Sequence, residues 1–255
     1  VNLLVRYGSV AKLQGFITNS GLITLGENGS SGQIRINGAV TLAGNGSLVM
    51  GSGAVTGRNG MPSYNYSPST YLDDQLTVGL NQTLRGAGQL GTGRIGILNQ
   101  GTILADRSAD GLSISTHAGG LTNHGLIEAR NGGFLYLSGD VDNTGGLIQA
   151  LAGSVARSDG NFVGGILQAA GGTVTTYGTV FGGTLLRAND NSTFYLGGIV
   201  KAGVQLATVG SGAIESQGAT FETGFEVPTG VNLLVRYGSV AKLQGFITNS
   251  GLITL

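Results

Sequence analysis

The feature that most constrains this chain is a 25-residue segment that occurs twice without a single difference. VNLLVRYGSVAKLQGFITNSGLITL fills Val1–Leu25 and again Val231–Leu255, at an offset of 230 residues. Identity over this length indicates that 1–230 is one full period of a tandem array and that 231–255 begins the next identical period. Such an array predicts an elongated stack in which each layer contacts only its neighbours.

The composition favours a chain that folds but turns often. It has 49 Gly, 3 Pro, no Cys and no Trp, with 40% hydrophobic and 10% charged residues. That hydrophobic content is too high for disorder, and glycine every few residues argues against helices, since each interior Gly costs a helix roughly 1 kcal/mol. We expect an all-β protein. A formal net charge of +0 gives no basic footprint for nucleic acid, and no apolar run is long enough for a transmembrane helix.

A shorter cadence runs inside the period, as glycine turns followed by short strands. Alternation along these strands predicts that one pair of residues in each faces the interior. The predicted interior pairs are Ile103/Ala105, Ile127/Ala129, Ile148/Ala150, Leu167/Ala169, Leu186/Ala188 and Val200/Ala202, at spacings of 24, 21, 19, 19 and 14 residues. The predicted outer positions between them are Leu104, Glu128, Gln149, Gln168, Arg187 and Lys201.

Strands this short, with coils of about 20 residues, fit a parallel β-helix (β-solenoid) of about 11 coils per 230-residue repeat. The turns carry Asn19, Asn99, Asn123 and Asn143 shortly before a glycine. Both residue types tolerate the left-handed conformation of a sharp corner. Stacked Asn side chains in such corners can also form hydrogen bonds along the axis, as amide ladders do.

The segment 57–74 breaks this cadence and is predicted to be a loop inserted into one coil. It contains two of the three prolines, and the candidate binding residues in it are Tyr64, Tyr66, Tyr71, Asp73 and Asp74. Tyrosines supply rigid contact area for sugars or proteins, so the loop could protrude as a binding element. The alternative is a lid that packs over an outer sheet.

A second irregularity is a set of apolar residues with the same parity as the outward polar ones. The set comprises Leu126, Leu147, Ile166, Leu185 and Ile199. Either a bulge after each glycine turns these side chains inward, or they form an exposed stripe available for lateral packing.

Catalytic and metal sites are not expected. The carboxylate pairs Asp73/Asp74, Asp106/Asp110 and Asp140/Asp142 are interpreted as solvated turn acids. His117 and His124 have no third ligand at a zinc-like spacing, and no nucleophile elbow surrounds Ser113 or Ser115. Oxygen-rich stretches at 139–142 and 189–191 do not follow the calcium-loop nonapeptide, so we expect no cofactor, while structural calcium remains an alternative.

Several stretches resemble the repeats of large secreted bacterial adhesins. The phrases are TLRGAGQLGTGRIGILNQGTILAD (83–106), LTNHGLIEARNGGFLYLSGDVDNTGGLIQALAGSV (121–155), GGILQAAGGTV (164–174) and LQGFITNSGLITL (243–255). They are similar to autotransporter passengers and filamentous-haemagglutinin-like proteins, with a degenerate TN-x-G-x-I phrase at Thr18 and Thr122. The resemblance implies a right-handed β-helix on the outside of a bacterium, serving as stalk, adhesin or matrix fibre.

Together these observations predict a non-enzymatic structural fibre or adhesin repeat, at the cell surface or in a secreted (biofilm) matrix. Its expected partners are further copies of itself, in tandem or end to end, and possible surface or matrix polysaccharide. The alternatives are a discrete carbohydrate-binding adhesin module and a β-helix enzyme that degrades polysaccharide.

Overall fold

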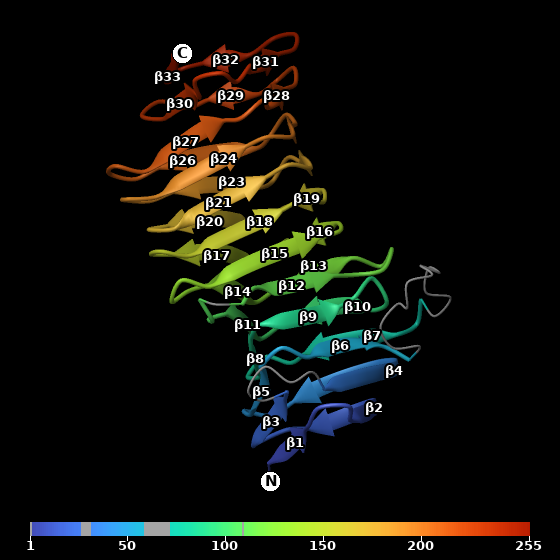
Figure 1. Ribbon diagram of the computed structural model, residues 1–255. Coiled ribbons are helices and arrows are strands. Elements are labelled where there is room, and N and C mark those ends of the chain that lie inside the picture. The colour runs from blue at the N-terminus through green and yellow to red at the C-terminus, as the bar shows by residue number, and fades with distance from the viewer. Residues whose placement is uncertain (1, 27–31, 59–71, 109) are drawn as a thin grey trace.

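The computed structural model describes residues 2–26, 32–58, 72–108 and 110–255. Over these residues the chain is an all-β solenoid of about 11 turns, as the sequence predicts (Figure 1). The strands stack as successive rungs from the N-terminal end to the C-terminal end (Figure 1). The described part of the chain has no helix that could span a bilayer.

Each coil contributes strands to three faces, and strands of one face pair in parallel between consecutive coils. Face 1 is a separate ten-stranded sheet. Its strands are β1 (Leu3–Val5), β3 (Leu22–Leu25), β5 (Ser47–Met50), β8 (Thr83–Gly86), β11 (Thr102–Ala105), β14 (Leu126–Ala129), β17 (Leu147–Leu151), β20 (Ile166–Ala170), β23 (Leu185–Ala188) and β26 (Gln205–Thr208).

Faces 2 and 3 are joined into one 21-stranded sheet by β2 (Val10–Thr18) and β4 (Gln33–Ala43), which are long enough to cross both. Face 2 continues with β6 (Ala54–Gly57), β9 (Gly88–Gly91), β12 (Leu112–Ser115), β15 (Phe134–Ser138), β18 (Val155–Ser158), β21 (Thr173–Thr176), β24 (Thr193–Leu196), β27 (Ala213–Ser216), β30 (Asn232–Val235) and β33 (Leu252–Thr254).

Face 3 continues with shorter strands. They are β7 (Gln75–Val78), β10 (Gly96–Asn99), β13 (Leu121–Asn123), β16 (Val141–Asp142), β19 (Phe162–Val163), β22 (Thr179–Val180), β25 (Ile199–Val200), β28 (Thr220–Phe221) and β31 (Lys242–Leu243). The two remaining strands, β29 (Glu226–Val227) and β32 (Thr248–Asn249), form a separate parallel pair. They follow β28 and β31 in the chain, in the position that a face 1 strand has in every earlier coil.

The core fills the inside of the solenoid. Along face 1, the alternation of inward and outward residues predicted its side chains correctly. Five of the six predicted interior pairs, from Ile103/Ala105 to Leu186/Ala188, are buried. The sixth prediction is wrong, because Val200 is buried on face 3, where it pairs with Val180, and Ala202 is exposed. Leu206 is the residue opposite Leu186. The last spacing is therefore 20 residues rather than 14.

The corner between faces 3 and 1 holds a buried amide ladder, which confirms the expected role of the stacked asparagines. Asn99 Nδ2 donates to Asn123 Oδ1 at 2.7 Å, and Asn123 Nδ2 donates to Asn143 Oδ1 at 2.6 Å. Asn143 Nδ2 then donates to the carbonyl of Ile166 at 3.0 Å. Asn19 lies outside this ladder, because its Nδ2 donates to Gln82 Oε1 at 3.1 Å instead.

The two copies of the duplicated segment close their own coil in the same register. In the first copy Leu3 pairs with Ile23, and in the second the equivalent Leu233 pairs with Ile253. The faces differ, however, because the first copy begins on face 1 with β1 and the second begins on face 2 with β30.

Candidate functional site

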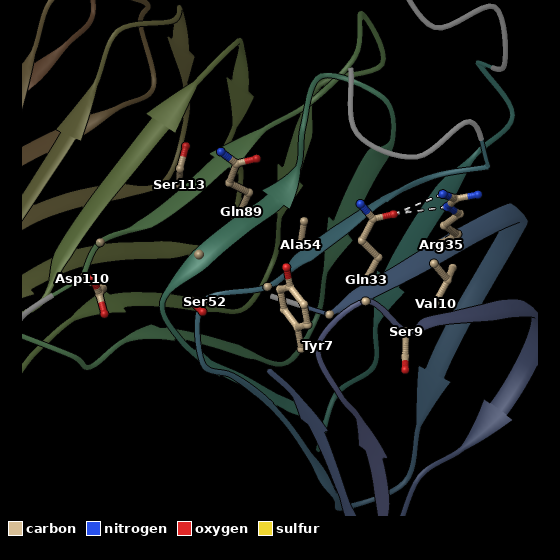
Figure 2. Close-up of a pocket in the computed structure, with 15 residues that line it drawn as sticks. Tyr7, Ser9, Val10, Gln33, Arg35, Ser52, Ala54, Gln89, Asp110 and Ser113 are labelled. Carbon is tan, nitrogen blue, oxygen red and sulfur yellow. Dashed lines mark hydrogen bonds between the residues drawn. The ribbon is translucent and has the colours of Figure 1, made fainter. Parts of the chain in front are cut away.

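A groove of about 670 Å³ lies on the outer side of face 2, toward the N-terminal end of the solenoid. Figure 2 shows Tyr7, Gln33 and Arg35 toward one end of it and Gln89, Ser113 and Asp110 toward the other. The Tyr7 ring is largely exposed. Gln33 Oε1 accepts hydrogen bonds from Nε and Nη2 of Arg35, both at 3.3 Å, which orients the guanidinium beside it (Figure 2).

The groove follows the solenoid axis because its polar side chains stand opposite one another on consecutive coils. Gln33 pairs with Ala54, Ala54 with Gln89, and Gln89 with Ser113. All four have the outward parity of face 2, although Ala54 itself is buried. Ala54 has the smallest side chain of this row, and it interrupts the row of longer side chains.

Glycines line the same groove because the coils come too close together for a side chain at the corner between faces 1 and 2. A Cβ on Gly53 would lie 2.7 Å from the carbonyl oxygen of Gly32, and one on Gly88 would lie 2.4 Å from that of Gly53. Gly88 also has φ of +109°, a conformation that L side chains rarely adopt. This close approach therefore requires glycine.

The row of outward side chains continues beyond the groove into a cluster of aromatic and charged groups. A second hollow of about 260 Å³ is lined by Gln89, Ser113 and Tyr136, so it adjoins the first. Tyr136 Oη donates to Asp159 Oδ2 at 2.7 Å, and the guanidinium of Arg157 lies 4.7 Å from the ring centre of Tyr177. Planar side chains therefore continue the outward row of face 2 beyond the groove, at Tyr136 and Arg157.

Hydrogen bonding within this cluster perturbs its acid and its phenol. The pKa of Asp159 is lowered, mainly by the hydrogen bond from Arg157, against the opposing effect of burial and with help from Tyr136. The hydrogen bond between Tyr136 and Asp159 raises the pKa of Tyr136, because the phenol donates to a carboxylate. Asp159 is therefore held in its charged form, as a fixed acceptor.

Of the candidate binding residues of the inserted loop, Tyr64, Tyr66 and Tyr71 lie outside the described residues. Asp74 is fully buried at the base of the loop, where Oδ1 accepts from the Gly38 amide at 2.7 Å and Oδ2 from the Arg58 amide at 2.9 Å. The Arg58 side chain also bonds Asp74 and, through Nη2, the exposed Asp73 at 2.7 Å. The buried Asp74 carboxylate therefore joins Arg58 to Gly38, and Asp73 faces solvent.

The pKa of Asp74 reflects two opposing causes. Burial alone raises it, but the hydrogen bonds from the Arg58 side chain, the Arg58 amide and the Gly38 amide together lower it below its ordinary value. The pKa of Arg58 is raised by the same two carboxylates, Asp74 first and Asp73 second. This clamp is a charged pair that remains ionised across the neutral range.

The candidate residues for lateral packing divide between two faces. Leu126, Leu147, Ile166 and Leu185 stand in register on the outer side of face 1 and are partly exposed. Ile199 lies on face 3, opposite Thr179 and Thr220, so it is not part of this row.

Beside that aliphatic row runs a polar one. Gln149 Nε2 donates to Glu128 Oε2 at 2.6 Å, Gln168 Nε2 to Gln149 Oε1 at 3.1 Å, and Arg187 Nη1 to Gln168 Oε1 at 3.3 Å. Two of the predicted outer positions, Leu104 and Glu128, have outward parity but are buried. A third, Lys201, is not part of this row, because the residue opposite Arg187 is Ala207. Lys201 instead contacts Glu222 at 2.8 Å.

Asp140, Asp142 and the two histidines bond to backbone groups of their own turn or of the next coil, whereas the side chains of Asp74 and Asp106 are buried in ion pairs with arginines rather than solvated. Asp140 Oδ1 accepts from the Asn161 amide at 3.1 Å, and Asp142 Oδ1 accepts from the Thr144 amide at 3.0 Å. His117 Nδ1 accepts from the Gly119 amide at 2.8 Å, and His124 Nδ1 contacts the Thr144 carbonyl at 2.8 Å. No three His, Cys, Asp or Glu side chains gather for a metal ion in the described ranges.

The groove and the tyrosine cluster were missed by the sequence reasoning, which concentrated on the inserted loop. Their sequence signal is outward parity: Gln33, Gln89, Tyr136, Arg157 and Tyr195 are each next to buried residues. Their alignment into one row depends on the lengths of the intervening coils.

Comparison with protein-family models, curated proteins and solved structures found no match to this chain.

Proposed function

We propose that this chain is a repeat of an extracellular structural fibre or adhesin, in which right-handed solenoid coils continue from one period into the next as a stiff rod. The observation that carries the proposal is the identical register of the two copies, Leu3 with Ile23 and Leu233 with Ile253. A sequence period that re-enters the stack by closing the same coil can be repeated, with the sheets of faces 2 and 3 hydrogen-bonded across the junction through β27–β30 and β28–β31.

Ladders along the axis support a mechanical role. Face 1 hydrogen-bonds without interruption from β1 to β26, and the buried Asn99, Asn123 and Asn143 amides link three coils through their side chains. Buried amide hydrogen bonds resist sliding of one coil on the next, since a slipped register leaves them unsatisfied. These features favour a rod over a flexible string of domains.

The end coils support self-association. β1 is the outermost strand of face 1 at the N-terminal end, and at the other end β33 has only β30 as its neighbour on face 2. Large apolar side chains are exposed there, including Phe16 in the first coil and Phe246 in the last. Open strand edges pair readily with further strands, so another period or another copy of this chain is the expected neighbour.

Electron microscopy of the purified chain, together with fibre diffraction, tests this proposal. We expect uniform filaments much longer than the roughly 50 Å rise of one period, with an axial reflection near the approximately 4.8 Å strand spacing. Leu234→Pro, which removes a strand N–H in the second copy, should shorten them, while Leu234→Thr should not. Separate single-chain particles at high concentration would contradict end-to-end assembly of copies, and two periods joined in one chain that gave no longer rod would contradict the fibre role.

A second candidate function is saccharide binding in the face 2 groove. Sugar hydroxyls need both donors and acceptors, which Gln33, Arg35 and Gln89 supply, and the exposed Tyr7 ring offers an apolar surface. Asp110 is the one carboxylate among the described lining residues, so the groove suits holding a glycan better than paired acid and base chemistry.

Binding to a panel of bacterial and host polysaccharides tests this second function. Gln89→Ala should weaken binding at least tenfold, whereas Gln168→Ala, an outward glutamine of the face 1 row, should leave it unchanged. Equal loss in both variants would contradict a site in the groove. Release of reducing sugar that Asp140→Ala abolishes would instead support the enzyme alternative.

A further inference from the structure

The duplicated segment occupies different faces of the solenoid in its two copies. In the first copy Val5, Leu13 and Ile23 are buried along faces 1, 2 and then 1 again. In the second copy Leu233 is fully buried on face 2 and pairs with Ile214, while Leu243 pairs with Phe221 on face 3. Each part of the coil therefore lies one face later in the second copy than in the first.

The displacement follows from the number of faces that one period fills. Starting from β1, the chain returns to face 1 through β3, β5, β8, β11, β14, β17, β20, β23 and β26, and then takes the equivalent position with β29. The second copy begins with the next strand, β30, on face 2. One period therefore makes ten complete turns and adds one further face.

The additional face is built into the sequence that precedes the second copy. Phe225 and Val227 are buried on either side of Glu226, so this short segment forms a wall of the core. The Phe225 ring lies 4.7 Å from that of Phe221 on face 3. A turn closed by the Val231 amide donating to the Pro228 carbonyl at 3.1 Å then directs the second copy onto face 2.

Contacts outside the backbone also hold the second copy on face 2. The guanidinium of Arg236 lies 5.2 Å from the ring centre of Tyr195, which stands on β24 of the same face. Glu215 on β27 is the residue opposite Leu234. The copy is thus joined to face 2 by both strand pairing and side-chain stacking.

We propose that successive periods of the fibre are rotated by a third of a turn about its axis, so that a given surface feature returns to the same side only every third period. This inference rests on the proposed fibre, in which the same sequence folds alike in each period. It follows because the period fills a number of faces that is not divisible by three.

The rotation determines how the fibre presents its surfaces. The groove on face 2 and the row from Leu126 to Leu185 on face 1 would recur roughly every 50 Å along the axis, each time on the next side of the rod. A partner that binds the groove would therefore meet sites on all three sides. Lateral packing through the aliphatic row would be possible in three directions, which suits a meshwork better than a flat bundle.

Cysteine cross-linking in this chain, which has no native cysteine, tests the placement directly. Directly opposite residues of adjacent coils lie within disulfide reach. We expect Glu215→Cys with Leu234→Cys to form an intramolecular disulfide. The control pair on face 1, Arg187→Cys with Ala207→Cys, should also form one, because these residues are opposite whether the second copy lies on face 2 or on face 1. Ala207→Cys with Leu234→Cys should not, because it would need the second copy on face 1.

The reverse pattern, cross-linking of both test pairs, or of neither while the control pair forms, would overturn the rotation. Peptide mapping of the oxidised proteins identifies the bond, and circular dichroism before oxidation verifies that each variant is folded. This result does not depend on filament formation, so a chain that cross-links as expected but never assembles would reject the end-to-end assembly of copies and not the placement. In filaments, helical reconstruction should give a rotation of a third of a turn per period.

Discussion

The side-chain amide of Asn123 donates to Oδ1 of Asn143 at 2.6 Å, and both side chains are completely buried. The two residues belong to consecutive coils, so the bond runs along the solenoid axis rather than within a coil. Because each amide both donates and accepts, neighbouring asparagines satisfy one another along the row, and at its start the buried Oδ1 of Asn99 accepts no hydrogen bond from the described residues.

Asn123→Ala should lower the free energy of unfolding by about 2 to 3 kcal/mol, since it leaves buried groups of Asn99 and Asn143 without this partner. Urea denaturation followed by circular dichroism measures the change. Asn81→Ala, at an exposed turn position, is the control and should change stability by less than about 0.5 kcal/mol. Equal effects would mean that the ladder adds no stability.

Asp74→Asn should make the solenoid less stable at neutral pH, by about 2 to 3 kcal/mol, because a buried charge-assisted clamp on Arg58 is lost. The pKa of Asp74 is lower in the folded chain than its ordinary 3.8, so its stabilising contribution is fully present above that value and is lost as the pH falls through the folded pKa. Thermal midpoints from pH 7 to pH 2 should therefore converge for the two proteins at the acid end. Asp73→Asn, at the exposed carboxylate, should cost less than about 1 kcal/mol.

Gly88→Ala should destabilise the chain by about 3 kcal/mol, since its Cβ would lie 2.4 Å from the Gly53 carbonyl and its φ of +109° is strained for alanine. Gly153→Ala is the matched control, with positive φ but nothing within 4 Å of the added Cβ, and should cost only about 1 kcal/mol. Differential scanning calorimetry compares them. Similar losses would show that backbone conformation alone accounts for the glycine.

Adjacent residues on β17 test the inside and outside of face 1. Ile148→Ala should cost about 2 to 5 kcal/mol because Ile148 is fully buried, whereas Leu147→Ala, on the partly exposed outer row, should cost about 1 kcal/mol. Chemical denaturation of both variants measures the difference. A larger loss for Leu147 would contradict the assigned orientation of the strand.

Much of the architecture was predictable because it depends on short-range patterns. Alternation along a strand decides which side chains face the core, and this predicted the five pairs from Ile103/Ala105 to Leu186/Ala188. The amide ladder followed from Asn residues recurring at equivalent corners. The predictions for Val200 and Ile199 were wrong because parity separates inward from outward side chains but does not tell which of the three faces a strand belongs to. The segment 197–202 has the sequence pattern of a face 1 strand but lies on face 3.

The sequence by itself determined that the chain is a stack of β-coils with glycine-rich turns. Both signals are local: the parity of side chains along a strand and the tolerance of positive φ at a turn each depend on a few adjacent residues. Only the tertiary structure decided which coils lie opposite one another. The number of residues between successive strands decides three features that the sequence did not predict. They are the row from Gln33 to Tyr136, the hydrogen bond between Asn19 and Gln82, and the start of the second copy on face 2. Those lengths take effect only when the coils close and their backbone hydrogen bonds select one register.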